Sequence, residues 1–441
     1  MLAAKDKRWG FFPSASLAWR ISQESFFKDN VSWVNELKLR GGYGSTGNLV
    51  NVINEQIVPF LYTPTYANSG GYMFGNTYYI NIAAGPTPVP EITWATNYET
   101  NLGLDFAVMN SRLSGSFDIF RKKKKNILGA RTITLPVTYG QALAPENYAA
   151  STFEGIELSL QWQERLADFS YSFYGNLGYS RDRWDILDPG SASYFPGQPQ
   201  DFRYPVGQPN NRLFGYEAVG LIRTQKELDE LIASGYTTFG RKPYLGGIRY
   251  KDVRGANFSK TPDGKIDDND VVLLSNNALP RINFGLGFSV SWKGISLEAL
   301  MQGVGNYDRM ISNQDGEGMR QHGGSIRPYY PIWTTDVWTP ENPNAKYPRP
   351  IGQNWLESGT LGSSFWVKNG AYLRLRNLNI SYNLPSKWMK PLGMTGTQIF
   401  LNGTNLLTFS EIKEFHDPEQ KNYDSYPVMK TFTVGLNIKF Q

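Results

Sequence analysis

The chain has 441 residues, a formal net charge of +5, 44 glycines, 14% aromatic residues and only 19% charged residues. This composition excludes a disordered or coiled-coil protein, and an average soluble domain carries more charge, about 25%. The absence of cysteine excludes a disulfide scaffold, a thiolate metal site and a cysteine nucleophile. The two histidines, His322 and His416, are too few for a histidine-rich metal site and argue against a histidine-based hydrolase triad.

The sequence contains no run of about 18 apolar residues, so no transmembrane helix is expected. The mean hydropathy of −0.41 leaves a β-barrel open, because its lipid-facing residues alternate with polar ones. The first residues, MLAAKDKRWG, contain no apolar segment followed by a cleavage site, so a signal peptide is absent from the sequence. Either the protein is cytoplasmic or the chain lacks its beginning.

Stretches in which every second residue is apolar recur along the chain and predict β-strands. In chain order they lie near 12–21, 101–108, 113–119, 156–163, 169–179, 282–292, 295–301 and 432–440. The pair 101–108 and 113–119 is joined by Asn110-Ser111, which predicts a hairpin. Only 225–233 has the spacing of an amphipathic helix.

The predicted strands have the length and the two faces of a membrane barrel. They run about 10 to 12 residues, longer than the usual five or six of soluble sheets and close to a tilted crossing of a bilayer. Their polar faces consist mostly of Gly, Ser, Asn and Thr, whereas a soluble sandwich carries longer charged side chains there. Aromatic residues collect near the strand ends, as in interface girdles. Examples are Trp9, Trp162, Tyr179, Trp292 and Phe440.

The connections alternate between short and long, which is typical of outer-membrane barrels with short periplasmic turns and long extracellular loops. The short ones are expected at 23–32, 110–111, 164–167, 293–294 and 385–396, and the long ones at 44–96, 122–151, 181–211, 304–370 and 408–428. Since 212–222 and 282–292 would both descend, a rising strand is expected between them, near 245–253. The tally is about thirteen strands, and this odd number predicts the C-terminal part of a larger barrel. An open sheet would leave two unpaired edges in lipid.

Distinct motifs follow one another along nearly the whole chain. They are WGFFPSASLAWRIS, NELKLRGGYGSTGN, NYETNLGLDFAVMNSRLSGSFDIFRKKKKNIL, FEGIELSLQW, YKDV with DGKIDDNDV, WTPENPNAKYPRP, YLRLRNLNISYNLP, FLNGTNLLTF and FTVGLNIKF. In this order they resemble the barrel of the SusC/RagA-type TonB-linked outer-membrane proteins. The number of motifs in register makes the resemblance specific.

The resemblance implies an all-β, antiparallel transmembrane barrel of the roughly 22-stranded class, closed by an N-terminal plug. It also implies two partners: a SusD-like surface lipoprotein that lids the barrel, and TonB, which couples inner-membrane energy to plug movement. The chain departs from the pattern by lacking a signal peptide, the TonB-contacting segment, the plug and roughly nine strands. Residues 1–441 are therefore expected to be the C-terminal part of the barrel. The chain also ends on Gln441 after Phe440, and its acidic loop is spread apart between Asp252 and Asp263.

The acidic segment after this insertion resembles half of a calcium loop. Asp263, Asp267 and Asp270 offer oxygen ligands around a glycine turn, which suits a hard cation. A full EF-hand spacing with a terminal glutamate is absent, so a solvated turn pinned by Asp and Gly is the favoured interpretation. No other cofactor is expected.

A basic run from Arg121 to Lys125 and the high pI invite a nucleic-acid interpretation. Strand parity instead places the run on the extracellular side of the membrane. A solvated strand end is expected there, or contact with outer-membrane lipid and lipopolysaccharide phosphates or with an acidic surface of a partner. Nucleic acid is not an expected partner.

Tryptophans of the long connection 304–370 are the candidate substrate-binding residues, because aromatic planes stack on sugar rings and grip peptides. They are Trp333, Trp338 and Trp355, with Trp366 nearby. The alternative is that these side chains hold the loop to itself or to the lipoprotein lid. No pair of carboxylates has a separation set by the sequence, so no catalytic residue is assigned and no enzyme is expected.

The sequence favours an importer in the cell outer membrane that passes an oligosaccharide or a peptide without chemistry. Without a plug, the chain alone is not expected to perform energised uptake. Two other classes stay open: a soluble or surface-attached β-rich carbohydrate-binding module or glycan hydrolase, and an outer-membrane adhesin on the same barrel. A soluble module purifies without detergent, whereas a barrel carries a continuous apolar belt about 25 Å tall.

Overall fold

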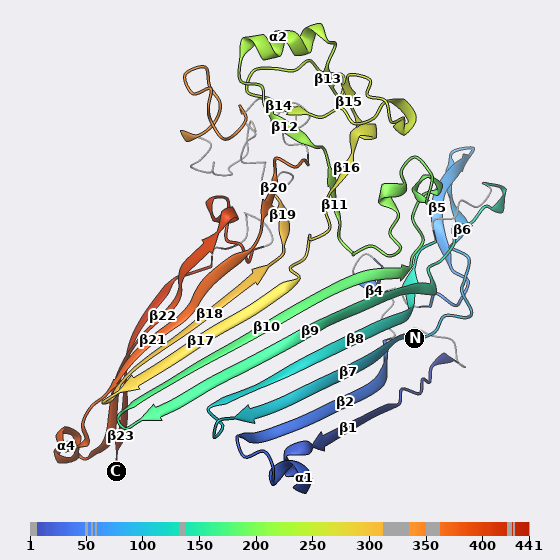
Figure 1. The fold of residues 1–441 in the computed structure, drawn as a ribbon. Helices are drawn as coiled ribbons and strands as arrows, with labels where there is room; N and C mark the ends of the chain where they lie inside the picture. Colours follow the sequence, from blue (N-terminus) through green and yellow to red (C-terminus); the bar gives the residue numbers. More distant parts are fainter. Residues whose placement is uncertain are drawn as a thin grey trace.

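Eleven strands form one curved antiparallel sheet (Figure 1). The computed structural model describes residues 7–48, 52–53, 56–57, 60–131, 137–311, 335–349, 362–420, 426 and 428–440. The strands of the sheet, each hydrogen-bonded to the next, are β1 (Ser14–Arg20), β2 (Val34–Asn48), β7 (Ala95–Val108), β8 (Leu113–Gly129), β9 (Glu146–Leu166), β10 (Phe169–Ile186), β17 (Ile282–Trp292), β18 (Ile295–Gly305), β21 (Tyr372–Asn383), β22 (Met394–Ser410) and β23 (Thr431–Phe440). Within these described residues, β1 and β23 are the outermost strands.

Short and long connections alternate, which confirms the prediction from the sequence. The short ones gather at the end of the sheet that carries α1 (Ser25–Lys28) and α4 (Ser386–Met389), and the long ones at the opposite end (Figure 1). The turn between β17 and β18 is tight, with Lys293 and Gly294 at φ of 46° and 90°. Such left-handed residues match the twist of a two-residue hairpin, and glycine adopts them at little cost.

The long connections carry short elements of their own. The strands are β3 (Val52–Ile53), β4 (Gln56–Ile57), β5 (Tyr66–Phe74), β6 (Thr77–Ala84), β11 (Leu213–Gly215), β12 (Ala218–Leu221), β13 (Thr237–Thr238), β14 (Ile248–Tyr250), β15 (Lys265–Ile266), β16 (Val272–Ser275), β19 (Asp308–Met310) and β20 (Val367–Asn369). The 3-10 helices of the whole described chain are η2 (Ile21–Gln23), η3 (Val137–Tyr139), η4 (Ala192–Tyr194), η5 (Asp201–Arg203), η6 (Ala256–Phe258), η7 (Asp268–Asp270), η9 (Lys390–Leu392) and η10 (Glu411–Glu414).

The helix predicted at 225–233 is confirmed as α2 (Gln225–Ala233). Thr224 caps it, and Glu227 completes a capping box by accepting hydrogen bonds from the backbone at its start. Across the described residues, no helix has the length and apolar content to cross a membrane.

The sheet has eleven strands among the described residues, so the prediction of about thirteen barrel strands is wrong there. The stretches 212–222 and 245–253 form short strands of the connection between β10 and β17, where β11 pairs with β16 and β12 with β14. Both stretches place apolar residues in a core, with Leu221 and Tyr250 8% and 3% exposed although Val219 is 58% exposed, whereas a barrel strand leaves a whole face open to lipid. Removing these two stretches from the count takes away one descending and one rising strand. The predicted directions of the other strands therefore do not change, and the number of strands stays odd.

One face of the sheet is apolar and exposed. Leu17 on β1, Leu102 on β7 and Phe173 on β10 are 83%, 60% and 51% exposed. The register continues this face from strand to strand, since Leu102 lies between Gly41 of β2 and Ile119 of β8. Large apolar side chains exposed over several strands are unfavourable in water and stable against hydrocarbon. The sheet therefore has the outer face of a membrane wall, and not that of one layer in a dry sandwich.

The opposite face is polar, and its side chains pair with one another. Arg40 of β2 donates to Asp105 of β7 (Nε to Oδ2, 2.9 Å) and to Asp118 of β8 (Nη2 to Oδ2, 2.9 Å). On neighbouring strands, the hydroxyl oxygens of Ser172 and Ser289 lie 2.9 Å apart. Small or charge-paired side chains of this kind suit the inner wall of a barrel.

A hydrophobic core lies in the long connections, beyond the end of the sheet (Figure 1). Its members, called the loop core below, are Tyr216, Leu221, Ile222, Leu231, Tyr236, Ile248, Tyr250, Ile266, Val271, Ile311, Tyr347, Trp366, Ile412 and Phe415. Aromatic rings hold its centre: Tyr347 stacks on Trp366 with ring centroids 6.3 Å apart, and Phe415 meets Tyr347 edge-on at 5.8 Å. The loop core joins the connections after β10, β18 and β22 into one unit.

Candidate functional site

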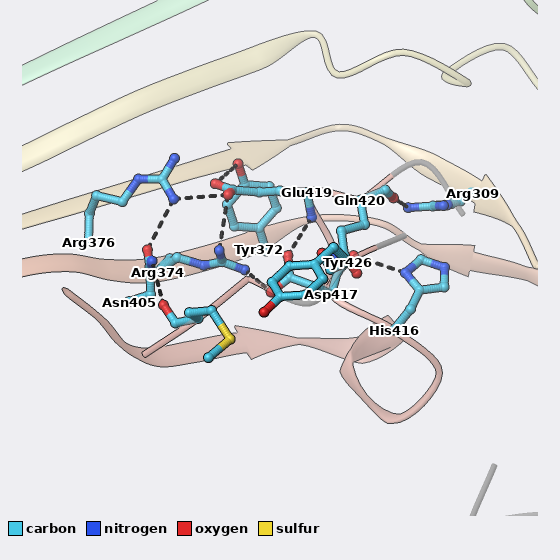
Figure 2. A network of polar contacts seen from close by, with 11 residues as sticks. Arg309, Tyr372, Arg374, Arg376, Asn405, His416, Asp417, Glu419, Gln420 and Tyr426 are labelled. Atoms are coloured by element: carbon cyan, nitrogen blue, oxygen red, sulfur yellow. Dashed lines mark hydrogen bonds and ion pairs between the residues drawn. The ribbon is translucent and has the colours of Figure 1, made fainter. Parts of the chain in front are cut away.

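The loop that follows β22 folds back onto the polar face of β21 (Figure 2). Arg374, which is fully buried, donates to Asp417 and to Glu419 of this loop, and its Nη1 lies 3.0 Å from Glu419 Oε2. Arg376 reaches the same oxygen with its Nη1 at 3.0 Å, and the Tyr372 hydroxyl donates to Glu419 Oε1 at 2.9 Å. Glu419 is thus held by three side chains of one strand.

The two arginines and the two carboxylates balance in charge. Taking an unpaired guanidinium out of water costs several kcal/mol, so a buried arginine needs carboxylate partners. The side chains of Asp417 and Glu419 are 20% and 18% exposed, and they supply those partners. Arg374 also pairs in register with Gln302 of β18, which places it on the polar face of the sheet. The arrangement clamps a loop against the inner wall.

The other side of the same loop enters the loop core. Ile412 and Phe415 are 0% and 4% exposed. Between them, Glu414 accepts hydrogen bonds from Lys346 Nζ at 2.7 Å and from the Tyr347 hydroxyl at 2.6 Å. Residues 411–420, called the clamp loop below, therefore connect the barrel wall to the loop core.

The contacts of Glu414 favour its charged form. Burial alone raises the pKa of this carboxyl, but the hydrogen bonds from Lys346 and Tyr347 and the charge of Lys346 outweigh burial, so the pKa lies below its ordinary value. Burial raises the pKa of Tyr347, and its hydrogen bond to Glu414 raises it further. The phenol therefore stays a donor and the carboxylate an acceptor at neutral pH.

The predicted substrate-binding tryptophans fall into two groups. Trp333 and Trp355 lie outside the described residues. Trp338 is 3% exposed and Trp366 is 1% exposed, and Trp338 bonds through its backbone N–H to Tyr347 O at 2.9 Å. A ring buried to this extent has little face left for stacking on a ligand, so Trp338 and Trp366 hold the loops together in this conformation. Substrate binding by these tryptophans stays a prediction.

The carboxylates of the acidic segment bond to backbone N–H groups. Asp270, fully buried, accepts from Val253 N at 2.8 Å and Arg254 N at 3.0 Å with Oδ1, and from Asp267 N at 3.0 Å with Oδ2. Asp263 accepts from Lys265 N at 3.0 Å. The described ranges contain no group of three or more acidic or histidine side chains placed to hold a metal. Calcium binding at this loop stays a prediction.

The basic run Arg121 to Lys125 lies at the long-loop end of β8 and is divided between the two faces. Successive side chains of a strand point to opposite sides, so Arg121, Lys123 and Lys125 share the face of Ile119, which is 50% exposed. Lys122 and Lys124 point to the polar face, where Lys122 Nζ lies 3.3 Å from Glu99 Oε1. Three cations of the run thus lie on the outer face of the wall and two on the inner face.

The sheet, with its apolar outer and polar inner face, matches a known family. Residues 2–406 match the sequence profile described as TonB dependent receptor-like, beta-barrel. The chain belongs to the TonB-dependent receptors. The proteins of this family are outer-membrane proteins, and the eleven strands are part of the receptor barrel.

Individual relatives support the family over nearly the whole chain. TonB-dependent receptor P26 of Formosa agariphila is 28% identical over 99% of this chain and 43% of that protein, and SusC of Bacteroides thetaiotaomicron is 25% identical over 99% and 41%. The chain thus spans less than half the length of these relatives. Both are named as receptors, and the resemblance to SusC/RagA-type proteins is confirmed.

Solved structures share the fold. The RagAB peptide transporter matches with a TM-score of 0.70 at 20% identity, over 99% of this chain and 44% of that one. The RagAB peptide importer in the closed-closed state matches with a TM-score of 0.71 over the same shares. At this level of identity the likeness shows the fold alone.

Sequence reasoning missed the residues of the clamp. YLRLRNLNISYNLP was recognised as a family motif, and Arg374 and Arg376 within it received no role. A signal was present, because two arginines two positions apart share one face of a strand, and they differ from the Gly, Ser, Asn and Thr of most polar faces. Their partners could not be found in the sequence, since Asp417 and Glu419 lie in an irregular loop 43 and 45 residues beyond Arg374.

Proposed function

We propose that this chain supplies barrel wall and extracellular cap to an outer-membrane importer that depends on TonB and moves an oligosaccharide or a peptide. The observation that carries the proposal is the division of the sheet into an exposed apolar face and a polar, charge-paired face onto which an extracellular loop folds. Membership of the TonB-dependent receptors supports the same role. Such a protein moves its cargo without making or breaking covalent bonds.

The polar face supplies the groups that a hydrophilic cargo needs along its path. Hydroxyl, amide and charged side chains line it, as in the pair Ser116 and Ser159, whose Oγ atoms lie 2.7 Å apart, and in Asn402, which donates to Asn377 at 3.1 Å. Groups of this kind exchange hydrogen bonds with sugars and peptides at little cost. The RagAB complex is described as a peptide transporter, which makes peptides one cargo class for testing, beside oligosaccharides.

A surface lipoprotein of the SusD type is the proposed extracellular partner. The hairpin of β5 and β6, in the long connection after β2, exposes large side chains: Tyr66, Phe74 and Ile82 are 73%, 76% and 66% exposed. Exposed apolar groups of this density are typical of a surface that another protein covers. The hairpin carrying them lies at the long-loop end of the sheet, where a lid would sit (Figure 1).

Uptake by living cells tests the proposal. Cells that make the protein are given fluorescent oligosaccharides and oligopeptides of graded length, and accumulation is measured with TonB present and after its depletion. We expect accumulation of one cargo class, lost on TonB depletion. Cargo bound at the surface but not accumulated in either condition would favour an adhesin.

The soluble carbohydrate-binding module or hydrolase is the competing class. A soluble fold without a barrel does not explain why large apolar side chains such as Leu17 and Leu102 are exposed in a row across the sheet. Extraction separates the two: we expect the protein in the membrane fraction, released only by detergent. A protein recovered from the aqueous fraction and monomeric there would contradict the importer.

A further inference from the structure

Basic side chains crowd the outer face of the wall directly above its apolar belt. The register aligns Ile119, Ile156 and Tyr179 of β8, β9 and β10 in one row. The next row toward the long loops consists of Arg121, Glu154 and Arg181. Lys123 and Arg183 follow in the row after that, on either side of Thr152, and Lys125 comes last.

Three guanidinium groups share one carboxylate in this cluster. Arg181 Nη2 and Arg183 Nη1 lie 2.6 and 3.0 Å from Glu154 Oε1, and Arg121 Nε lies 3.6 Å from Glu154 Oε2. Asp185 is the second acid, with Oδ1 at 3.3 Å from Arg183 Nε. On this face of β8 to β10 the five cations above the belt meet these two carboxylates, which leaves an excess of three positive charges.

The excess charge is open to the surroundings. The side chains of Arg121 and Arg181 are 48% and 56% exposed, and Lys123 and Lys125 are exposed as well. Like charges at this density repel one another, and an anion between them lowers that cost. Guanidinium forks match the oxygens of a phosphate, which they bind in a bidentate manner.

The position of the basic cluster next to the apolar belt favours a phosphate that belongs to a lipid. Ile119 and Ile156, one row below, are 50% and 41% exposed, and they belong to the apolar belt. A ligand that covers both rows has an anionic head and an apolar body, and lipid phosphates lie at this boundary of a bilayer. A free phosphate would leave the apolar row uncovered.

We propose that Arg121, Lys123, Lys125, Arg181 and Arg183 bind the phosphorylated headgroup of lipid A, the glycolipid of the outer leaflet, with its acyl chains against the Ile119 row. The proposal rests on the outer-membrane placement given under the proposed function. It assigns a role to the outward half of the basic run and none to Lys122 and Lys124.

The two halves of the run provide a matched pair of variants. Arg121→Gln with Lys123→Gln removes two outward charges, and Lys122→Gln with Lys124→Gln removes two inward ones. The protein as its cell makes it is placed in phosphatidylcholine nanodiscs, and bis-phosphorylated lipid A is titrated in at low ionic strength. Each cation near an anionic lipid surface counts for about a factor of five. The outward pair is therefore expected to weaken lipid A binding roughly 30-fold, and the inward pair less than about twofold.

Each other outcome overturns the proposal. The proposed site is contradicted if the variant lacking the two outward charges binds lipid A as the wild type does. It is also contradicted if the variant lacking the two inward charges loses as much affinity as the outward one. Equal affinity for dephosphorylated lipid A shows that the acyl chains alone bind, and equal affinity for inorganic phosphate in detergent shows a site for free anions.

Two further measurements keep the result interpretable. A heat-dependent gel shift verifies that each variant is folded, and Arg121→Lys with Lys123→Arg, which keeps both charges, is expected to retain binding. Uptake is measured in the same cells: loss of uptake with lipid A binding intact counts against the importer and leaves the lipid site standing.

Discussion

Arg374 of β21 and Glu419 of the clamp loop are joined at 3.0 Å, from Nη1 to Oε2, although 45 residues of chain separate them. The first belongs to the barrel wall, and the second to a loop whose Ile412 is fully buried in the loop core. The ion pair therefore lies where the sheet meets the long loops. Loops over a transport path are commonly the parts that move, so this contact is suited to hold the cap in one position.

Replacing Arg374 by methionine is expected to release the clamp loop. Removal of one partner from a buried ion pair leaves the other charges uncompensated, at a cost of roughly 3–5 kcal/mol. Hydrogen exchange of amides 411–420 should become faster, while the amides of β21 keep their protection from the strand ladder. Arg20→Met is the control, because Arg20 and Glu36 are 58% and 42% exposed and 3.7 Å apart. Such a surface pair contributes less than about 1 kcal/mol, so equal exchange in both variants would contradict the clamp.

Acid is expected to weaken the other anchor of this loop. The pKa of Glu414 is lowered in the folded protein below the ordinary value of 4.5. A carboxyl of this kind stabilises the fold fully at a pH above its unfolded pKa, and the stabilisation is lost as the pH falls through the folded pKa. The melting temperature of the loops in wild type and in Glu414→Gln should differ by a constant amount above pH 4.5, and the difference should shrink below it. A difference that grows on acidification would contradict the assignment.

The sheet was predictable from the sequence because its signal is local. Every second residue is apolar from Ile282 to Trp292 in β17 and from Leu102 to Val108 in β7, and the turn residues between strands are adjacent in the chain. The predicted number of strands was too high for the same reason, because it included the short stretches that contain Leu221 and Tyr250. Short apolar stretches look alike whether they face lipid or enter a loop core, and strands of three or four residues do not extend far enough to distinguish the two.

The clamp and the basic cluster depend on contacts that the sequence does not contain. Arg121 and Arg181 come together only through the register of β8, β9 and β10 around Glu154. Strand parity placed the basic run toward the long loops, where the structure has it. The division of its charges between two faces additionally requires that the pleat stays regular as far as Lys125. The positive φ of 55° at Asn126 marks where that regularity ends.

The loop core is expected to unfold separately from the sheet when its central ring is removed. Trp366 is 1% exposed and packs on Phe365 with ring centroids 4.9 Å apart. Truncating a buried tryptophan to alanine costs about 3–5 kcal/mol, so Trp366→Ala should lower the first transition in calorimetry and leave the barrel transition in place. Trp388, on the short-turn side and 54% exposed, is the control, and Trp388→Ala should leave both transitions within about 0.5 kcal/mol. A shift of the barrel transition alone would contradict a separate loop core.

The acidic segment is expected to depend on Asp270 far more than on Asp263. Asp270→Ala leaves three partly buried N–H groups without their acceptor, and should destabilise the loops by roughly 3 kcal/mol. Asp263→Ala removes one exposed hydrogen bond and should cost less than about 1 kcal/mol. EDTA should leave the melting temperature of the wild type unchanged, because both carboxylate oxygens of Asp270 already accept hydrogen bonds from the protein. A drop on adding EDTA that calcium reverses would instead favour the calcium site.

Two adjacent positions of β7 test which face meets the membrane. Leu102 is 60% exposed on the apolar face, and Asn101 precedes it on the polar face. An arginine at the lipid side of a barrel costs about 2–4 kcal/mol near the bilayer centre, whereas lumen positions tolerate charge. Leu102→Arg should therefore reduce the amount of folded protein in the membrane fraction, seen as loss of the heat-dependent gel shift, and Asn101→Arg should not. The reverse pattern would place hydrocarbon on the polar face and end the importer account, since the paired charges of Arg40 and Asp105 would then lie in lipid.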